Sequence, residues 1–112
     1  MKYTIFWSKS AVRDLQRVRH FLKNISPNSA NNVATQINQY TQKLAMFPLV
    51  GKPVEMLEGY YDLFIPFAAA GYTLRYRVYK QSIYVIFIKH LINSSVFFFN
   101  LAPLPAAKII PV

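Results

Sequence analysis

The sequence of 112 residues contains no cysteine, and only four of its residues are acidic. Without cysteine the protein forms no disulfide and offers no thiolate for a metal ion or for nucleophilic catalysis. The two histidines, His20 and His90, have few carboxylates near them in the sequence. No phosphate-binding glycine loop, dinucleotide-binding turn or G-x-S-x-G motif occurs. We therefore expect a protein with no metal and no cofactor.

Long apolar runs are also missing. The longest are Ile83–Ile88 and Val96–Phe99, whereas a membrane-spanning helix needs about 20 consecutive apolar residues. Near the N-terminus, Lys9 and Arg13 interrupt the apolar stretch that a secretion signal requires. We expect a cytoplasmic protein with no membrane partner.

Positive charge is what the sequence has in excess. Thirteen Lys and Arg residues against four Asp and Glu residues give a net charge of +9. This excess favours an anionic partner, because phosphates or carboxylates relieve the repulsion between the cations and release counterions. Nucleic acid and an acidic protein both meet that requirement. The acidic residues are too few to favour hydrolysis by paired carboxylates; they are Asp14, Glu55, Glu58 and Asp62.

The first half of the sequence predicts one strand followed by two helices. Residues 2–7 show the alternation of a half-buried strand. Ser8 is placed to cap a first helix, and Ser26 with Pro27 suits the start of a second helix. The second helix is expected to reach about residue 47, where Pro48 blocks it. The apolar stripes expected to face a core are Ala11, Leu15, Val18, Leu22 and Ile25 in the first helix, and Ala30, Val33, Ala34, Ile37, Tyr40, Thr41 and Leu44 in the second.

The second half predicts a loop over residues 51–59 and then strands over residues 61–67, 72–79 and 83–88. The strand over residues 72–79 alternates, with one apolar face that consists of Tyr72, Leu74, Tyr76 and Val78. The short turns between these strands require antiparallel pairing. The last strand is almost entirely apolar, so we expect it to be central and covered, or nearly covered, on both faces. The predicted fold is α+β: an N-terminal strand, a helical hairpin and a three-stranded antiparallel meander, with the helices packed on one face of a small, mostly antiparallel sheet.

Cations cluster on the predicted strands. Arg75 and Arg77 share one face of a strand, and Lys89 and His90 end the neighbouring strand. Such a row on an open sheet face suits phosphate or carboxylate binding, and Tyr79 and Tyr84 would add stacking surfaces for a base. His90 is the candidate for proton transfer. The alternative is that the arginines only keep an exposed face hydrated and that His90 has no chemical role.

Four segments, in this order and spacing, resemble toxins of the RelE/ParE family from type II toxin–antitoxin systems. They are Trp7–Leu15, Met46–Val54, Tyr61–Phe67 and Gly71–Val78. The resemblance covers about residues 2–90 and implies the fold described above. We therefore expect a toxin domain over residues 1–90. It also implies a cognate antitoxin as partner, for which Arg13, Arg17 and His20 on the first helix are the predicted contact residues.

The resemblance implies two possible targets. RelE-like members cut mRNA on the ribosome with basic residues and often a tyrosine on the sheet face, whereas ParE-like members inhibit DNA gyrase. The Trp-Ser-x-x-Ala opening and the Ile-Pro-Phe strand are closer to ParE-like and plasmid-stabilisation relatives. Arg75 and Arg77 match basic strand positions of the family, and His90 matches the histidine that often closes the last strand.

The sequence departs from the family after His90. No Arg or Tyr follows, although family members usually have them there, so a ribonuclease is disfavoured. Residues 91–112 form an atypical hydrophobic tail with three prolines, and Lys108 is its only charge. We therefore expect a ParE-like toxin that inhibits growth and is not an enzyme. The alternatives are a RelE-like mRNA endoribonuclease and an inactive toxin fold that only binds its antitoxin, as a dimer or a hetero-oligomer.

Overall fold

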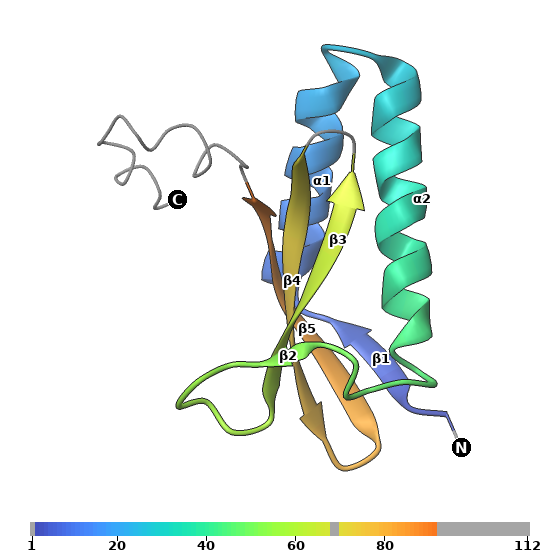
Figure 1. Ribbon diagram of the computed structural model, residues 1–112. Coiled ribbons are helices and arrows are strands. Elements are labelled where there is room, and N and C mark those ends of the chain that lie inside the picture. The colour runs from blue at the N-terminus through green and yellow to red at the C-terminus, as the bar shows by residue number, and fades with distance from the viewer. Residues whose placement is uncertain (1, 68–69, 92–112) are drawn as a thin grey trace, which may run out of the picture.

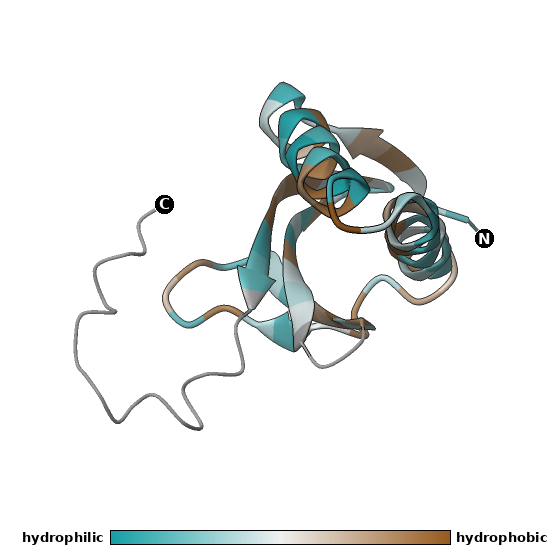
Figure 2. Ribbon diagram, turned by 90° about the horizontal axis from the view of Figure 1, so that it is seen from above, coloured by the Kyte–Doolittle hydropathy of each residue, from teal (hydrophilic) through white to brown (hydrophobic). Residues whose placement is uncertain are grey.

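The predicted α+β architecture is confirmed by a computed structural model, which describes residues 2–67 and 70–91. Two helices lie side by side on one side of a twisted five-stranded sheet (Figures 1 and 2). The sheet order is β1-β5-β4-β3-β2; β1 is parallel to β5 and the other pairs are antiparallel. The elements are β1 (Thr4–Trp7), α1 (Lys9–Lys23), α2 (Pro27–Lys43), β2 (Lys52–Pro53), β3 (Tyr60–Phe67), β4 (Ala70–Tyr79) and β5 (Ser82–Leu91). Apart from Leu91, the predicted tail lies outside the described residues.

Both helices begin where the sequence predicts. The Ser8 hydroxyl accepts a hydrogen bond from the Ala11 N–H at 3.0 Å, and Ser26 caps α2 with Pro27 in its first turn. The helix ends differ from the prediction. Because α1 ends at Lys23, Ile25 lies beyond the apolar stripe to which we assigned it, and its side chain is 68% exposed. Helix α2 ends at Lys43 rather than near residue 47.

The core lies between the two helices and the sheet face that they cover. The alternation predicted for β4 is confirmed, since Tyr72, Leu74 and Tyr76 all point into this core. Burial of such side chains contributes about 1.5–3 kcal/mol each to folding. The buried cluster consists of Ala11, Val33, Ile37, Leu44, Ile65, Tyr72, Leu74, Tyr76, Ile83, Val85 and Ile88.

Strand β5 is an inner strand for part of its length, but it is not the middle one. β4 takes that place, and only one face of β5 is covered, because Ile83 and Val85 are buried whereas Tyr84 is exposed. The ladder with β4 also shifts: Tyr76 pairs with Val85, but Arg75 pairs with Phe87. The residue between these partners is the extra residue of a β-bulge.

A two-residue strand, β2, lies in the segment that we predicted to be only a loop. It pairs with β3 and holds the connection from α2 against the sheet. The Tyr76 hydroxyl anchors this connection, because it donates to the Pro48 carbonyl at 2.8 Å and accepts from the Gly51 N–H at 2.9 Å. A Cβ at Gly51 would lie 2.8 Å from that hydroxyl oxygen, so only glycine fits there without a shift.

We predict that Tyr76→Phe lowers the free energy of unfolding by about 1–3 kcal/mol, because it leaves the buried Gly51 N–H without its acceptor. Urea unfolding followed by circular dichroism measures this difference. Tyr61→Phe is the matched control: Tyr61 stacks on Tyr76, and within the described residues its hydroxyl makes no hydrogen bond. Equal destabilisation of the two variants would contradict the anchoring role.

Candidate functional site

The sheet face turned away from the helices carries aromatic and charged side chains in cross-strand rows. Strand register defines these rows, because residues paired across a ladder project from the same face. The first and second rows run through four strands each, and the third runs through three. They contain Phe6, Tyr84, Arg77 and Tyr60; Lys52, Asp62, Arg75 and Phe87; and Phe64, Thr73 and Lys89, respectively. We call this surface the open face.

Arg77 lies at the centre of the first row. Its guanidinium carbon is 5.5 Å from the ring centre of Tyr60 and 5.2 Å from that of Tyr79, so two aromatic rings flank it. On the other side of Arg77 in the row, Tyr84 stacks on Phe6 with ring centres 5.4 Å apart. Arg77 is exposed and takes part in no ion pair among the described residues. It is therefore placed to bind an anionic or aromatic group of a partner.

Arg75 forms an ion pair with Asp62. Its guanidinium donates to both carboxylate oxygens of Asp62, from Nε at 2.8 Å and from Nη2 at 3.0 Å. The hydrogen bond to Asp62 raises the pKa of Arg75 above its usual value. The same guanidinium lies over the ring of Phe87, which Lys89 also contacts at 4.5 Å from the ring centre. Sequence analysis missed this role of Asp62; only the register between β3 and β4 reveals it.

Lys89 and His90 project from opposite faces of β5. Lys89 pairs with Thr73 on the open face, whereas His90 pairs with Tyr72 on the helix face. The rings of His90 and Tyr72 lie 5.1 Å apart. Burial lowers the pKa of His90 and raises that of Tyr72, which favours the uncharged form of both side chains near neutral pH. The structure thus brings Arg75, Arg77, Lys89 and Tyr79 to one face and places His90 on the other.

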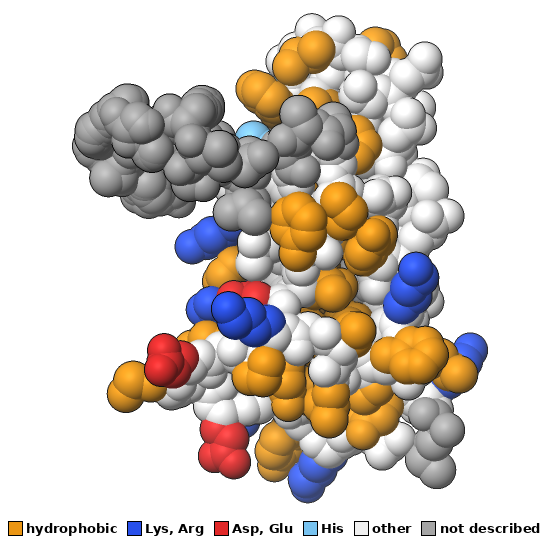
Figure 3. Space-filling model, in the orientation of Figure 1, with side chains coloured by type: hydrophobic (Ala, Val, Ile, Leu, Met, Phe, Trp, Pro, Cys, Tyr) orange, Lys and Arg blue, Asp and Glu red, His pale blue; other side chains and the backbone are white. Residues whose placement is uncertain are grey.

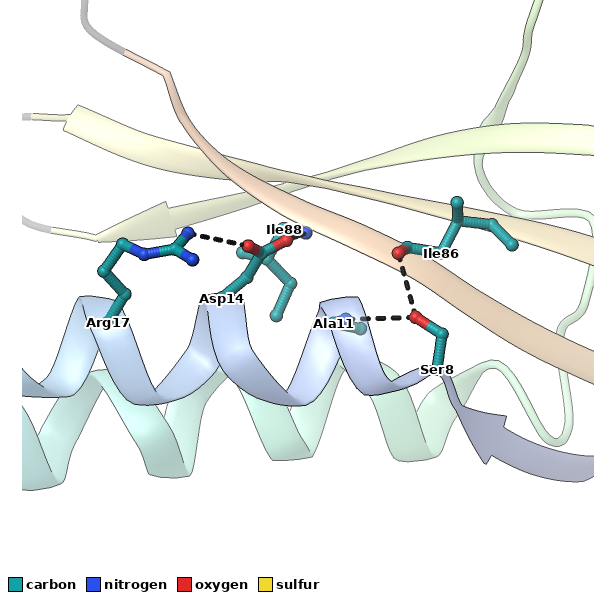
Figure 4. A network of polar contacts seen from close by, with 6 residues as sticks. All are labelled: Ser8, Ala11, Asp14, Arg17, Ile86 and Ile88. Carbon is teal, nitrogen blue, oxygen red and sulfur yellow. Dashed lines mark hydrogen bonds and ion pairs between the residues drawn. The ribbon is translucent and has the colours of Figure 1, made fainter. Parts of the chain in front are cut away.

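Helix α1 holds the outer edge of β5 beyond the end of β1 (Figure 4). The Ser8 hydroxyl donates to the Ile86 carbonyl at 3.0 Å, and one Asp14 oxygen accepts from the Ile88 N–H at 2.9 Å. The other Asp14 oxygen forms an ion pair with Arg17 at 2.9 Å. Arg17 therefore already forms an ion pair within the chain. The other two predicted contact residues, Arg13 and His20, are exposed on α1.

Large apolar side chains are also exposed, and six of them lie in the connection that follows α2. In Figure 3, orange apolar side chains spread over the middle and lower parts of the surface, with Lys and Arg mostly toward its margins. The exposed residues of this connection are Met46, Phe47, Leu49, Val50, Met56 and Leu57. Scattered exposure is common on protein surfaces, but six large apolar residues in one short segment favour contact with a partner.

The residues that the structure describes contain no group of three or more His, Asp or Glu side chains arranged to hold a metal ion. None of the helices in residues 2–67 and 70–91 is long and apolar enough to cross a membrane.

Comparison with known proteins gives consistent matches. Residues 5–91 match the family model described as "ParE toxin of type II toxin-antitoxin system, parDE". A relative from Caulobacter vibrioides, "Toxin RelE3", is 31% identical over 80 residues, which cover 71% of this chain and 85% of the relative.

Solved structures share the fold. A chain of the chromosomal ParDE toxin–antitoxin system from P. aeruginosa has a TM-score of 0.67 at 20% identity, covering 81% of this chain and 98% of that one. A chain of the Mycobacterium tuberculosis RelBE2 toxin–antitoxin complex has a TM-score of 0.55 at 23% identity, covering 80% and 99%. An E. coli RelE mutant in the free state has a TM-score of 0.58 at 17% identity, covering 87% and 92%.

We predict that protonation of His90 destabilises the protein. Because the pKa of His90 is lowered in the folded state, the unfolded state binds more protons as the pH falls below about 6.5, and stability decreases with it. Urea midpoints at pH 7.5 and pH 5.5 measure the change. His90→Gln should reduce it, while His20→Gln on the exposed side of α1 should not. An unchanged pH dependence in His90→Gln would show that His90 does not contribute.

Proposed function

We propose that this chain, which belongs to the ParE family of toxins from type II toxin–antitoxin systems, arrests growth by inhibiting DNA gyrase. Within the RelE/ParE superfamily, the match of residues 5–91 to the ParE model supports the gyrase inhibitor over the ribonuclease. We place the protein in the cytoplasm, where gyrase acts. We also propose that the protein contributes to plasmid stabilisation.

The observation that carries this proposal is the separation of His90 from the cations. A general base must lie within hydrogen-bond distance of the proton that it removes. His90 lies on the helix face against Tyr72, and the open-face carboxylate, Asp62, is bound to Arg75. The open face therefore offers exposed rings and cations for contact with a partner. Neither His90 nor a carboxylate free of Arg75 lies beside them to act as a general base. Arg77, flanked by Tyr60 and Tyr79, is the residue that we assign to target contact.

We further propose that a cognate antitoxin neutralises this toxin and forms a hetero-oligomer with it. The net charge of +9 favours an acidic partner segment. Arg13, Arg17 and His20 lie at intervals of four and three residues, which places them on one side of α1, and all three are exposed. An antitoxin with carboxylates at matching intervals would pair with this side.

Purified protein added to DNA gyrase with relaxed plasmid tests the proposed activity. We expect wild-type protein to block supercoiling, and Arg77→Ala to weaken inhibition at least tenfold while leaving the fold intact, because Arg77 makes no ion pair within the described residues. Arg19→Ala, an equal loss of charge on exposed α1, is the control. Supercoiling that continues in excess folded protein would refute the gyrase target.

A RelE-like ribonuclease is the second candidate, and one observation favours it. The row of Phe6, Tyr84, Arg77 and Tyr60 presents rings and a cation in the arrangement that stacks bases and binds phosphates of a single strand. The name of the 31% identical relative, "Toxin RelE3", supports the same candidate.

Incubation of the protein in a translation extract, followed by mapping of mRNA 5′ ends, separates the two candidates. Cleavage that depends on ribosomes and disappears in Arg77→Ala would replace the gyrase proposal with the ribonuclease. Intact mRNA together with blocked supercoiling is the result that we expect. If neither activity appears while an antitoxin still binds, the chain is an inactive toxin fold.

A further inference from the structure

Strand β1 forms one edge of the sheet, and part of its backbone points away from its neighbour. It is the first strand in the sheet order and pairs with β5. The N–H groups of Thr4 and Ser8 donate toward β5, to carbonyl oxygens at 3.0 and 3.1 Å. Because the N–H and C=O groups of successive residues point to opposite sides of a strand, those of Ile5 and Trp7 point outward.

The start of β1 confirms this orientation. The Tyr3 N–H, two residues before Ile5, donates to the Ala45 carbonyl at 2.9 Å on the side away from β5. This bond places the connection after α2 beside the first residues of β1, at the lower right of Figure 1. Among the described residues, no backbone group outside the sheet ladder binds Ile5 or Trp7. Two successive outward positions of the strand are therefore unpaired.

Elsewhere, side chains and a proline protect the margin of the sheet. Ser8 and Asp14 bind the outer side of β5 beyond the end of β1. On β3, Pro66 has no N–H and its carbonyl accepts a hydrogen bond from Gln36 at 2.8 Å, while β2 pairs with the same strand near its start. Proline and charged residues are the usual protection of an edge strand. Residues 4–7, which form β1, include neither.

The core is also incompletely covered at this edge. Ile5 and Trp7 pair with residues of β5 that are fully buried on the helix face. Their own side chains pack against the same core but remain partly exposed. Met46, which follows Ala45 beside the start of β1, is 57% exposed. A strand added to β1 would cover these side chains, provided that its residues on the helix face are apolar.

The charge around β1 favours an acidic partner. Lys2 and Lys9 flank the strand, and both are exposed. Asp14 is the only acidic residue within residues 1–54, and its carboxylate already binds β5. A second copy of the chain would bring the same lysines to this edge and be repelled. A segment with carboxylates on both sides of its apolar residues would instead pair with them.

We propose that β1 binds an extended, acidic segment of a partner protein as an additional strand of the sheet. Backbone hydrogen bonds to Ile5 and Trp7 hold the segment, because only an extended chain presents N–H and C=O groups at the spacing of a strand edge. Its apolar side chains cover the core beside β1, and its carboxylates pair with Lys2 and Lys9. This inference depends neither on the gyrase target nor on the antitoxin contact proposed for α1.

Fluorescence anisotropy with a labelled peptide of sequence EEVTVTVEE tests the proposal on the full-length protein. Its valines alternate as a strand requires, and glutamates flank them. Two further peptides are controls. KKVTVTVKK reverses the charge. A form of EEVTVTVEE that is methylated on the backbone nitrogens of its five central residues keeps the side chains and loses the hydrogen-bond donors.

Two variants of Ile5 test the protein side of the contact. Ile5→Pro removes the outward N–H, which the sheet does not use, whereas Ile5→Ala shortens the side chain and keeps that N–H. We expect EEVTVTVEE to bind Ile5→Pro at least tenfold more weakly than Ile5→Ala, while circular dichroism confirms the fold of both. Both control peptides should bind the wild-type protein at least tenfold more weakly than EEVTVTVEE.

Equal binding of the methylated peptide to the wild-type protein, a result that needs no variant, would overturn strand addition. Equal binding of KKVTVTVKK would overturn the acidic character of the partner. Absence of EEVTVTVEE binding up to about 1 mM would also contradict the proposal. A dimer in sedimentation that Ile5→Pro dissociates would assign the edge to a second copy of the protein and overturn it as well.

Discussion

The arrangement of the whole sheet depends on the way in which α1 closes the outer edge of β5. Strand β1 ends at Trp7, so the backbone of β5 beyond Val85 has no neighbouring strand on that side. Unpaired groups at a sheet edge are costly when buried and invite aggregation when exposed. Here the Ser8 N–H, the Ser8 hydroxyl and the Asp14 carboxylate bind the Val85 carbonyl, the Ile86 carbonyl and the Ile88 N–H. Ser8 and one side of α1 thus take the place that a longer β1 would occupy beside β5.

The register between β4 and β5 determines which side chains share a face. The bulge after Val85 shifts the pairing of β5 by one residue, and Asp14 binds the strand at Ile88, two residues beyond the extra residue. Because alternate residues of a strand project from opposite faces, a shift of one residue reverses their directions. Lys89 therefore joins Arg75 and Thr73 on the open face, and His90 meets Tyr72 on the helix face. The register between β4 and β5 therefore determines which residues form the open face, the surface that we propose contacts the target.

Much of the fold follows from the sequence, because local signals specify it. The caps Ser8 and Ser26 and the alternation of β4 are short-range patterns, and the structure confirms them. The assignment of Ile25 to the apolar stripe of the first helix was wrong, because the apolar spacing continues past Lys23, where the helix ends. Strand β2 was missed, since two residues carry no periodic signal.

The candidate site was less predictable, because long-range register forms it. The sequence places Arg75 and Arg77 on one face, but nothing local shows that Asp62 binds Arg75 or that Asp14 binds the backbone of β5. Asp62 and Arg75 are 13 residues apart, and Asp14 and Ile88 are 74 residues apart. The bulge that puts Lys89 rather than His90 on the open face likewise appears only in the paired strands.

The closure of β5 by α1 is tested most directly by native-state hydrogen exchange at the Ile88 amide. Asp14→Ala removes the acceptor of this N–H, while Arg17→Ala removes only the ion pair and leaves the acceptor in place. The account predicts that the Ile88 amide exchanges at least tenfold faster in Asp14→Ala than in Arg17→Ala, with the Ile83 amide unchanged. Equal protection of Ile88 in the two variants would show that Asp14 does not hold this edge.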